Sequence, residues 1–365
     1  MERLSFEKYT RQKRINNKHF QRRLCSKNVK KHGVRRVKKG SVSRDIVVFA
    51  PYIIDLYKVN NHKKFNAFIS DIEKAAIRVS SSKRSLKISF RDTRAITASA
   101  CLLLIAKVDV IINKFKTLKF KLARPHNHPT PGPKKPINLV DAVLCQVGFY
   151  ELIGKKTSSV DINNPSVKCW KFASSEESDG SIAGPILKNI EDDNISQSIL
   201  YRSCIEAISN AAEHAYSTET SIKKTFSLKK WWIFVGSINK EYVVIVCDVG
   251  HGIPNTLELT QKTSLLNKIW EKIGSPNIGT HGDCEYIKAS TLVKETRTGL
   301  SHRGKGTTDL RTFVDKTDKS KMIIFSNRGT YRYFNKKCKR LSNAYDNSSS
   351  IGGTIVEWSV PSTSC

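Results

Sequence analysis

The sequence predicts a mixed α/β protein, and three observations lead to this fold class. Over residues 45–154, apolar runs typical of strands alternate with segments whose apolar residues recur at helical spacing. Further along the chain, an amphipathic helix precedes a β-hairpin and more strands. The longest apolar run, ACLLLIA, is broken by Lys107 and Asp109, far short of the roughly 20 residues that a membrane span needs. We therefore expect no membrane partner.

The charge balance indicates a polyanionic partner. The chain has 63 Lys and Arg against 32 Asp and Glu, a net charge of +31. Such a field favours nucleic acid, a nucleotide, an anionic surface or an acidic protein. The nine cysteines are scattered without a CxxC pair, which argues against a zinc ribbon or redox dithiol and indicates a reducing compartment. With no apolar stretch in MERLSFEKYTRQKR to serve as a secretory signal, we expect a cytoplasmic protein.

Residues 1–44 are predicted to form a basic, poorly ordered arm. They contain 16 Lys and Arg but two acids, Glu2 and Glu7, and their sparse apolar residues follow no clear period. One interpretation is contact with nucleic acid through phosphates. The other is a solvated tail or a weak helix that docks a partner. The sequence leaves both open.

Residues 45–155 are predicted to form an α/β domain. The strands expected are DIVVFAP from Asp45, SLKISF over 85–90 and LKFKLAR over 118–124. The helices expected between and after them cover residues 63–79, 97–115 and 137–154. A polar linker follows over residues 156–193, with VKCWKFA as one candidate strand.

Two segments of this domain, ISFRDTRAITASACLLLIAKVD and LVDAVLCQVGFYEL, resemble the STAS-like domains of bacterial regulators. In those domains a strand leads to a Ser or Thr that is phosphorylated at the start of a helix. Thr97 and Ser99 lie nearest that place, although Ile96 stands near where the family has an acidic residue before the serine. The alternative is that these hydroxyls only cap the helix.

A helix predicted over residues 194–217 carries two faces. Its apolar stripe is expected to contain Ile199, Ile205, Ile208, Ala212 and Ala215.

Polar side chains of the same helix recur every four residues: Arg202, Glu206, Asn210 and His214. Taken alone, such a row is more typical of a solvated face.

A β-hairpin is predicted from WWIFVGSI and YVVIVCDV, and it delivers Asp248 at the end of its second strand. Gly250 and Gly252 follow, and glycines let the backbone approach a neighbouring group closely. A fixed, partly buried carboxylate needs a donor such as an exocyclic amine, and that of adenine fits. The alternative is a tight turn after an edge strand.

A second glycine-rich segment, TRTGLSHRGKGTTDL, combines Gly304, Lys305 and Gly306 at the expected start of a helix. Backbone amides, a helix N-terminus and cations aimed at one place form a phosphate site. A hairpin over residues 321–334 and a last strand over 352–361 complete the predicted domain, which covers residues 194–361.

Four motifs in this order resemble those of the GHKL ATPase superfamily. They are the N-box EAISNAAEHAY, the first glycine box DVGHGI, the second glycine box HRGKGTTDL and the third glycine box GGT. The resemblance implies a two-layer α/β sandwich that binds ATP with Mg²⁺. It also implies that Asp248 accepts the adenine amino group, that Asn210 binds Mg²⁺ and that Glu206 is the general base, while His214 orients the N-box or packs.

The resemblance further implies a set of residues beside the nucleotide, drawn from the three glycine boxes: Gly250, Gly252, Ile253, Gly304, Lys305, Gly306 and Thr354.

Within the superfamily, the pattern E-x-x-x-N-x-x-x-H is closest to the anti-sigma-factor serine kinases. It implies a regulator that acts as a protein Ser/Thr kinase or an ATP-driven switch on a STAS-like partner or on its own first domain. The alternative is a nucleic-acid-binding ATPase gated by ATP, for which the basic arm and the net charge speak. The sequence leaves open which of these holds, and whether the chain forms a homodimer.

Overall fold

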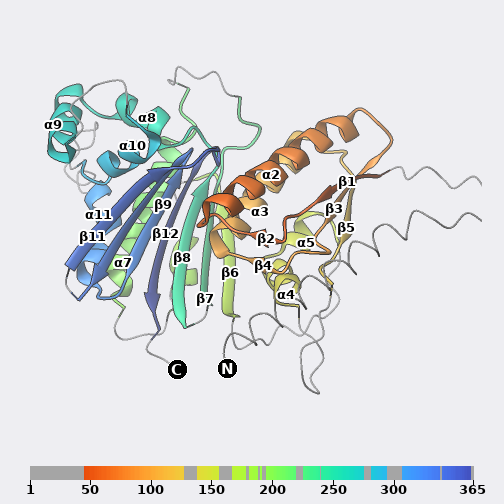
Figure 1. The fold of residues 1–365 in the computed structure, drawn as a ribbon, viewed down its shortest axis with the longest axis horizontal. Coiled ribbons are helices and arrows are strands. Elements are labelled where there is room, and N and C mark those ends of the chain that lie inside the picture. Colours follow the sequence, from red (N-terminus) through yellow and green to blue (C-terminus); the bar gives the residue numbers. More distant parts are fainter. Residues whose placement is uncertain are drawn as a thin grey trace, which may run out of the picture. The chain divides into compact units, whose positions relative to one another are not determined.

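A large antiparallel sheet and a small parallel sheet, both packed against helices, make up the fold (Figure 1). The computed structural model describes residues 45–126, 138–155, 167–177, 181–187, 190, 195–218, 225–238, 240–274, 281–293, 306–337 and 339–362. The predicted basic arm, residues 1–44, lies outside the described residues. The prediction of a mixed α/β protein is confirmed.

The first part of the chain alternates strands and helices as predicted. Its three-stranded sheet has the order β1-β3-β5 with both pairs parallel, and β2 pairs with β4 in a separate parallel pair. Parallel neighbours require crossover connections, which the helices supply. The elements are β1 (Asp45–Phe49), β2 (Ile53–Ile54), α2 (Val59–Ser80), β3 (Ser85–Ser89), β4 (Ala95–Ile96), α3 (Ala98–Lys114), β5 (Phe120–Ala123), α4 (Leu139–Gln146) and α5 (Phe149–Leu152).

The prediction of a single helix over residues 137–154 is wrong, because the chain forms two short helices there. Gly148 separates α4 from α5 with a φ of +71°, in the left-handed region that interrupts a right-handed helix. Asn138 caps α4 by accepting from the amides of Val140 and Asp141.

The large sheet has seven strands in the order β11-β10-β9-β12-β8-β7-β6, and its neighbouring strands are all antiparallel. The segment predicted as a linker supplies its edge strand β6. The strands are β6 (Val167–Ser175), β7 (Trp231–Ile238), β8 (Glu241–Asp248), β9 (Lys321–Ser326), β10 (Gly329–Lys336), β11 (Lys339–Asp346) and β12 (Thr354–Pro361). The helices of this half are α6 (Ala183–Leu187), α7 (Gln197–Glu213), α8 (Ile253–Thr260), α9 (Thr263–Ile273), α10 (Asp283–Ser290) and α11 (Gly306–Lys316).

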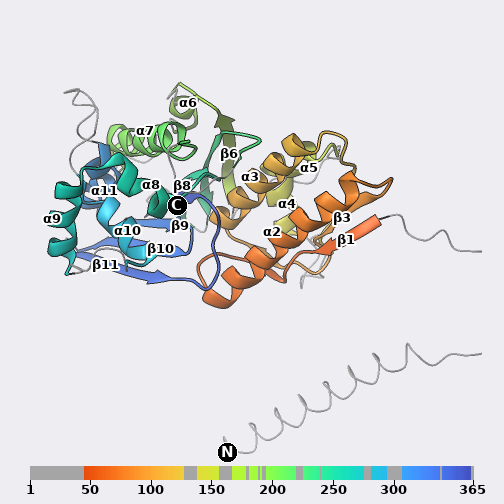
Figure 2. The same cartoon turned by 90° about the horizontal axis from the view of Figure 1, so that it is seen from above.

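The two faces of the large sheet belong to different cores. Alternate residues of β8 point to opposite faces. Val244 and Val246 pack with α7 and α11, whereas Val243 and Ile245 pack with the helices of the first part. Figure 2 shows α7 on one side of the sheet and α3 on the other. The first part of the chain and the large sheet therefore share one hydrophobic core.

Two charged residues of the otherwise apolar helix α3 have hydrogen-bond partners in the second half of the chain. The Lys107 ammonium donates to the carbonyl of Gly352 at 2.9 Å. Asp109 accepts from the Lys230 ammonium and from the indole of Trp232, both at 3.2 Å. Both charges thus meet partners from the second half of the chain, and the buried Asp109 requires such partners.

A buried carboxylate on β12 joins the same interface. Glu357 is 4% exposed and accepts hydrogen bonds from the hydroxyls of Tyr57 and Ser99. Burial raises the pKa of Glu357, and the two hydroxyl donors oppose that shift. Ser99, a predicted phosphorylation site, is therefore fully buried, and a kinase can reach its hydroxyl only after α3 leaves the sheet.

None of the helices in the described ranges is long and apolar enough to cross a bilayer.

Candidate functional site

The carboxylate of Asp248 lies at the end of β8, on the sheet face that α7 and α11 cover. The side chain is 6% exposed, and its Oδ1 accepts a hydrogen bond from the Gly250 amide at 2.9 Å. The turn after the strand thus orients the carboxylate. The structure has a fixed, buried acid where the sequence predicts one.

Thr354 is the cross-strand neighbour of Asp248, because β12 pairs with β8 in that register. On its other side Thr354 faces Ser326 of β9, and their hydroxyl oxygens are 3.0 Å apart. The buried Trp231 of β7 flanks Asp248 on the remaining side. Opposite residues of paired strands are near neighbours, so this end of the sheet gathers a carboxylate, two hydroxyls and an indole.

The turn after Asp248 is held against the end of α7. A Cβ added to Gly250 would lie 2.6 Å from the carbonyl carbon of Ala215, and the His251 amide donates to the Ala215 carbonyl at 2.7 Å. The Val249 amide donates to the hydroxyl of Tyr216 at 3.3 Å. Gly250 is thus required by the close approach of two backbone segments. This contact holds the turn after β8 and the end of α7 together.

Gly252 serves a different purpose in the same turn. It precedes α8 with a φ of +82°, and a Cβ there would lie 2.7 Å from the side-chain amide of Asn327. The Asn327 side chain donates to the carbonyl of His251 at 2.9 Å, and the Ile253 amide donates to the Ser326 hydroxyl at 2.8 Å. The start of α8 is therefore tied to the hairpin of β9 and β10.

The backbone at Gly353 approaches the turn after β8 closely. Gly353 has a φ of +147°, and a Cβ on it would lie 2.6 Å from the Cα of Val249. Its carbonyl accepts from the amide of Asn327 at 3.1 Å. Gly353 thus helps to bring the predicted neighbours Asp248 and Thr354 together. No residue with a side chain could replace it unless the backbone of Asp248 and Val249 moved.

Two oxygen-bearing side chains lie one turn apart on α7. Glu206 and Asn210 are both half-buried, and Nδ2 of Asn210 donates to Oε1 of Glu206 at 3.2 Å. The amide oxygen of Asn210 is then the atom left to bind a cation. His214 caps the end of this helix, and burial lowers its pKa, an effect that Glu213 opposes.

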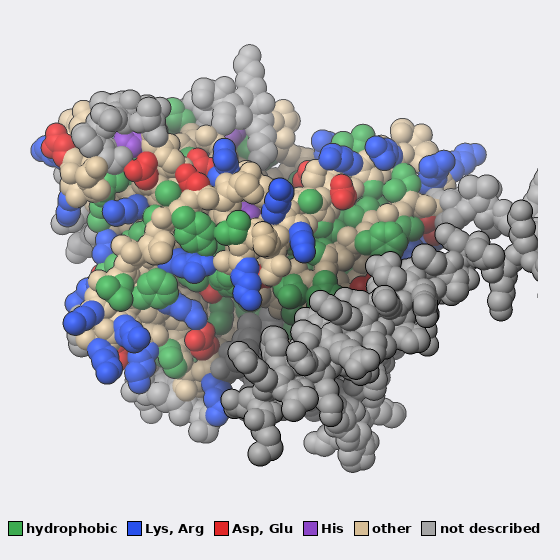
Figure 3. Space-filling view, in the orientation of Figure 1, with side chains coloured by type: hydrophobic (Ala, Val, Ile, Leu, Met, Phe, Trp, Pro, Cys, Tyr) green, Lys and Arg blue, Asp and Glu red, His purple; other side chains and the backbone are tan. Residues whose placement is uncertain are grey.

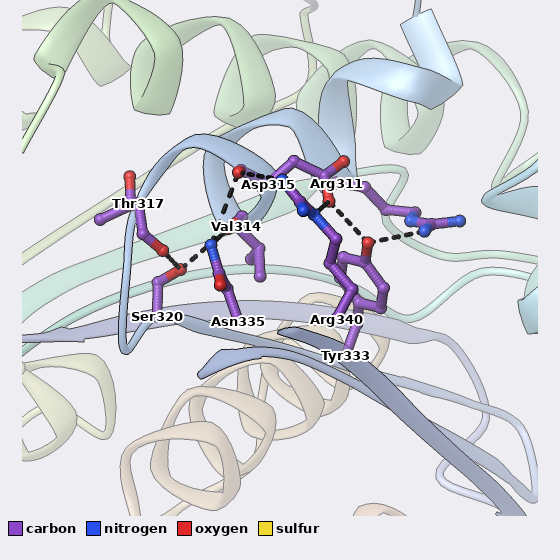
Figure 4. Close-up of polar contacts among 8 residues, drawn as sticks. All are labelled: Arg311, Val314, Asp315, Thr317, Ser320, Tyr333, Asn335 and Arg340. Atoms are coloured by element: carbon purple, nitrogen blue, oxygen red, sulfur yellow. Dashed lines mark hydrogen bonds and ion pairs between the residues drawn. The ribbon is translucent and has the colours of Figure 1, made fainter. Parts of the chain in front are cut away.

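A polar cluster anchors α11 to the sheet (Figure 4). Nη2 of Arg311 donates to the hydroxyl of Tyr333 at 2.7 Å, and this hydroxyl donates to Oδ1 of Asp315 at 2.6 Å. Nε of Arg340 lies 3.3 Å from the same carboxylate oxygen. The cluster fixes the second half of the helix that Gly306 begins.

Two members of the second glycine box, Gly304 and Lys305, lie outside the described residues.

The donor set around α7 suits a hard cation, which prefers oxygen ligands. Among the described residues, no group of three or more His, Cys, Asp or Glu could hold a metal ion. An Mg²⁺ at Asn210 would therefore need further oxygens from water and from a phosphate-bearing ligand, as Mg²⁺ usually does.

Several residues that build the site escaped the sequence prediction. Ser326 and Asn327 were expected only in or beside a hairpin turn, yet they hold the start of α8. Tyr216 follows α7, and its hydroxyl accepts a hydrogen bond from the Val249 amide and donates one to the carbonyl of Lys230. Hydrogen bonds between residues distant in sequence leave no periodic pattern to detect.

The hydroxyl of Thr97, the other predicted phosphorylation site, precedes α3. Its Oγ1 is buried, and it has no hydrogen-bond partner among the described residues.

Comparisons of the chain with protein-family models, with curated proteins and with solved structures find no match.

Proposed function

We propose that this protein is a Mg²⁺-dependent, ATP-binding regulator with a GHKL-type nucleotide site formed by α7, the end of β8 and the start of α11. The observation that carries the proposal is the contact of Gly250 and His251 with the carbonyl of Ala215. It joins the buried carboxylate of Asp248 to the helix that bears Glu206.

Each residue has a role that its surroundings support. Asp248 accepts a hydrogen bond from the adenine amino group, and the amide of Gly250 keeps the carboxylate in position. Asn210 binds Mg²⁺ through its amide oxygen. Mg²⁺ supplies charge neutralisation of the phosphates and of the negative charge that develops during phosphoryl transfer.

Glu206 is the proposed general base. Its carboxylate takes the proton of the attacking water or hydroxyl as that oxygen bonds to the γ-phosphorus and the bond to ADP breaks. The hydrogen bond from Asn210 orients the carboxylate. The same arrangement serves an ATPase and a protein kinase, which differ in the acceptor of the phosphoryl group.

The experiment incubates the full chain with γ-labelled ATP and Mg²⁺, and it follows label into free phosphate and into protein. Glu206→Ala should abolish transfer and leave ATP binding intact, whereas Asp248→Asn should weaken ATP binding itself. Glu213→Ala, which removes an exposed acid from the same helix, is the matched control and should change neither. Unchanged ATP affinity in Asp248→Asn, or an equal loss in Glu213→Ala, would contradict the proposed site.

The destination of the label separates the two activities. Label in free phosphate alone favours an ATP-driven switch, and label on protein favours a kinase. Because Ser99 is buried against Glu357, label at Ser99 would require that α3 leave the sheet during the reaction.

A further inference from the structure

The seven-stranded sheet has a surface that α3 does not cover. In Figure 1, no described helix lies in front of β10 and β11. Tyr331 and Tyr333 of β10 belong to the core beneath α11, so the alternate residues of that strand point to the opposite side. We name this surface the open face. It is formed by Lys321, Arg332, Phe334, Lys336, Lys339, Leu341, Asn343 and Tyr345.

The open face concentrates positive charge. Lys336 and Lys339 are directly opposite each other in the register of β10 and β11, and both are exposed. Like charges in that position destabilise a sheet unless an anion compensates them. Lys321 of β9 is the cross-strand neighbour of Phe334, and its ammonium forms an ion pair with the carboxylate of Glu241 at 2.8 Å. None of the eight residues is acidic, and Figure 3 shows Lys and Arg together with apolar side chains on this side of the molecule.

Planar and apolar groups lie beside these cations. Phe334, which is half-buried, faces Leu341, which is 55% exposed. The guanidinium carbon of Arg332 lies 5.4 Å from the ring centroid of Tyr345, and its Nη2 donates to the Tyr345 hydroxyl at 2.9 Å. Nη2 also donates to the carbonyl of Tyr57 at 3.1 Å, which holds the guanidinium in place.

We propose that the open face binds single-stranded nucleic acid. Phosphates bind at Lys336 and Lys339, and bases stack on Phe334 and on the ring of Tyr345. Cations that follow a backbone, with aromatic rings that receive bases, are how sheets bind single strands. From Lys336 back to Gly329, at the start of β10, the face extends about 23 Å, enough for a few nucleotides.

The observations favour this partner over an acidic protein. The centres of protein interfaces are depleted in lysine, whereas the open face has lysines beside its only exposed apolar residue among the eight, Leu341. The face is also separate from the site at Asp248, which lies on the other side of the sheet. The proposal therefore does not depend on ATP binding.

The test measures fluorescence anisotropy of a fluorescein-labelled oligothymidylate dodecamer with the full chain at several salt concentrations. Lys336→Gln with Lys339→Gln should weaken binding and reduce the log–log salt slope by about 1.4, since each phosphate contact on a single strand contributes about 0.7. The matched control is Lys63→Gln with Lys64→Gln, which removes the same charge from exposed positions of α2 and should leave the slope unchanged.

Phe334→Leu keeps an apolar side chain but removes the ring. It should weaken binding by about tenfold, within the range measured for loss of one stacked base, and leave the salt slope unchanged. The proposal is overturned if the lysine pair and its control behave alike, which would assign binding to other basic residues. It is equally overturned if polyglutamate competes as well as the unlabelled oligonucleotide and Phe334→Leu has no effect, since the face would then take an acidic protein.

Discussion

Replacing Gly250 by alanine should separate the turn after β8 from the end of α7. The added Cβ would lie 2.6 Å from the carbonyl carbon of Ala215 and 2.7 Å from its Cβ. Ordinary van der Waals contact begins at 3.4 Å, so the two segments must move apart by about 1 Å. The carbonyl carbon is a backbone atom at a helix end, so no flexible side chain can yield instead.

Two costs add up in this variant. Loss of the hydrogen bond from His251 to Ala215, now 2.7 Å long, costs about 1–3 kcal/mol when the groups stay buried. Crowding of a packed region costs about 1–3 kcal/mol. We therefore expect the free energy of unfolding to fall by about 2–6 kcal/mol. ATP affinity should fall at least about tenfold, because the Gly250 amide also orients Asp248.

Urea unfolding followed by tryptophan fluorescence measures the first effect, and calorimetric titration with ATP measures the second. Gly184→Ala is the matched control, because the nearest atom to its added Cβ, Cε2 of Tyr201, lies at an ordinary 3.6 Å. A helical Gly-to-Ala change of this kind should leave stability within about 1 kcal/mol of the parent chain. If Gly250→Ala unfolds at the same urea concentration as the parent and binds ATP equally well, the contact with Ala215 does not hold the site.

Three further predictions concern the interface between α3 and the large sheet and the buried histidine of α2. Lys107→Met removes the donor to the Gly352 carbonyl and should lower the free energy of unfolding by about 1.5–3 kcal/mol; Lys107→Arg keeps a donor, and equal losses in both variants would contradict this role. Burial raises the pKa of Glu357, so the native state keeps this proton to higher pH than the unfolded chain, and stability falls as the pH rises above 4.5. Glu357→Gln should flatten that fall in urea titrations at different pH, and an unchanged profile would refute the assignment. Burial lowers the pKa of His62 from 6.5 to about 4, so the unfolded chain takes up the proton first and stability is lost as the pH drops through this window. His62→Gln should remove that loss of stability, which urea titrations at different pH would measure.

Local patterns in the sequence predicted the elements that carry Asp248. An uninterrupted apolar run followed by an acid and glycines is typical of a buried strand and its turn, and β7 and β8 form the expected hairpin. The turn between β9 and β10 at Asn327 was also predicted and is confirmed. Each of these features depends on neighbours in the chain.

The buried face of α7 was predicted less accurately than the hairpin of β7 and β8. The expected stripe included Ile199 and Ile205, but both are partly exposed, and the helix buries small residues such as Ser203, Ala207 and Ala211. Small side chains permit close packing of a helix, whereas a hydrophobicity pattern gives more weight to isoleucine. The outcome depends on what packs against the helix.

Strand β11 shows the limit of periodicity. Seven of the eight residues from Lys339 to Asp346 are exposed, so no alternation of apolar and polar residues marks a strand. The segment is a strand because its backbone pairs with β10.

The position of β12 has a consequence for the order in which the protein forms. This strand follows all the others in the chain, yet it lies between β9 and β8 in the sheet. During synthesis the remaining strands can assemble only as two separate pieces, β11-β10-β9 and β8-β7-β6, until β12 joins them. Ser99 and its hydrogen-bond partner Glu357 are 258 residues apart in the sequence, so Ser99 is synthesised long before this partner. Contacts so distant in sequence slow folding, and the apolar surface of α3 that packs against β12 stays uncovered on the ribosome until the last of these strands emerges.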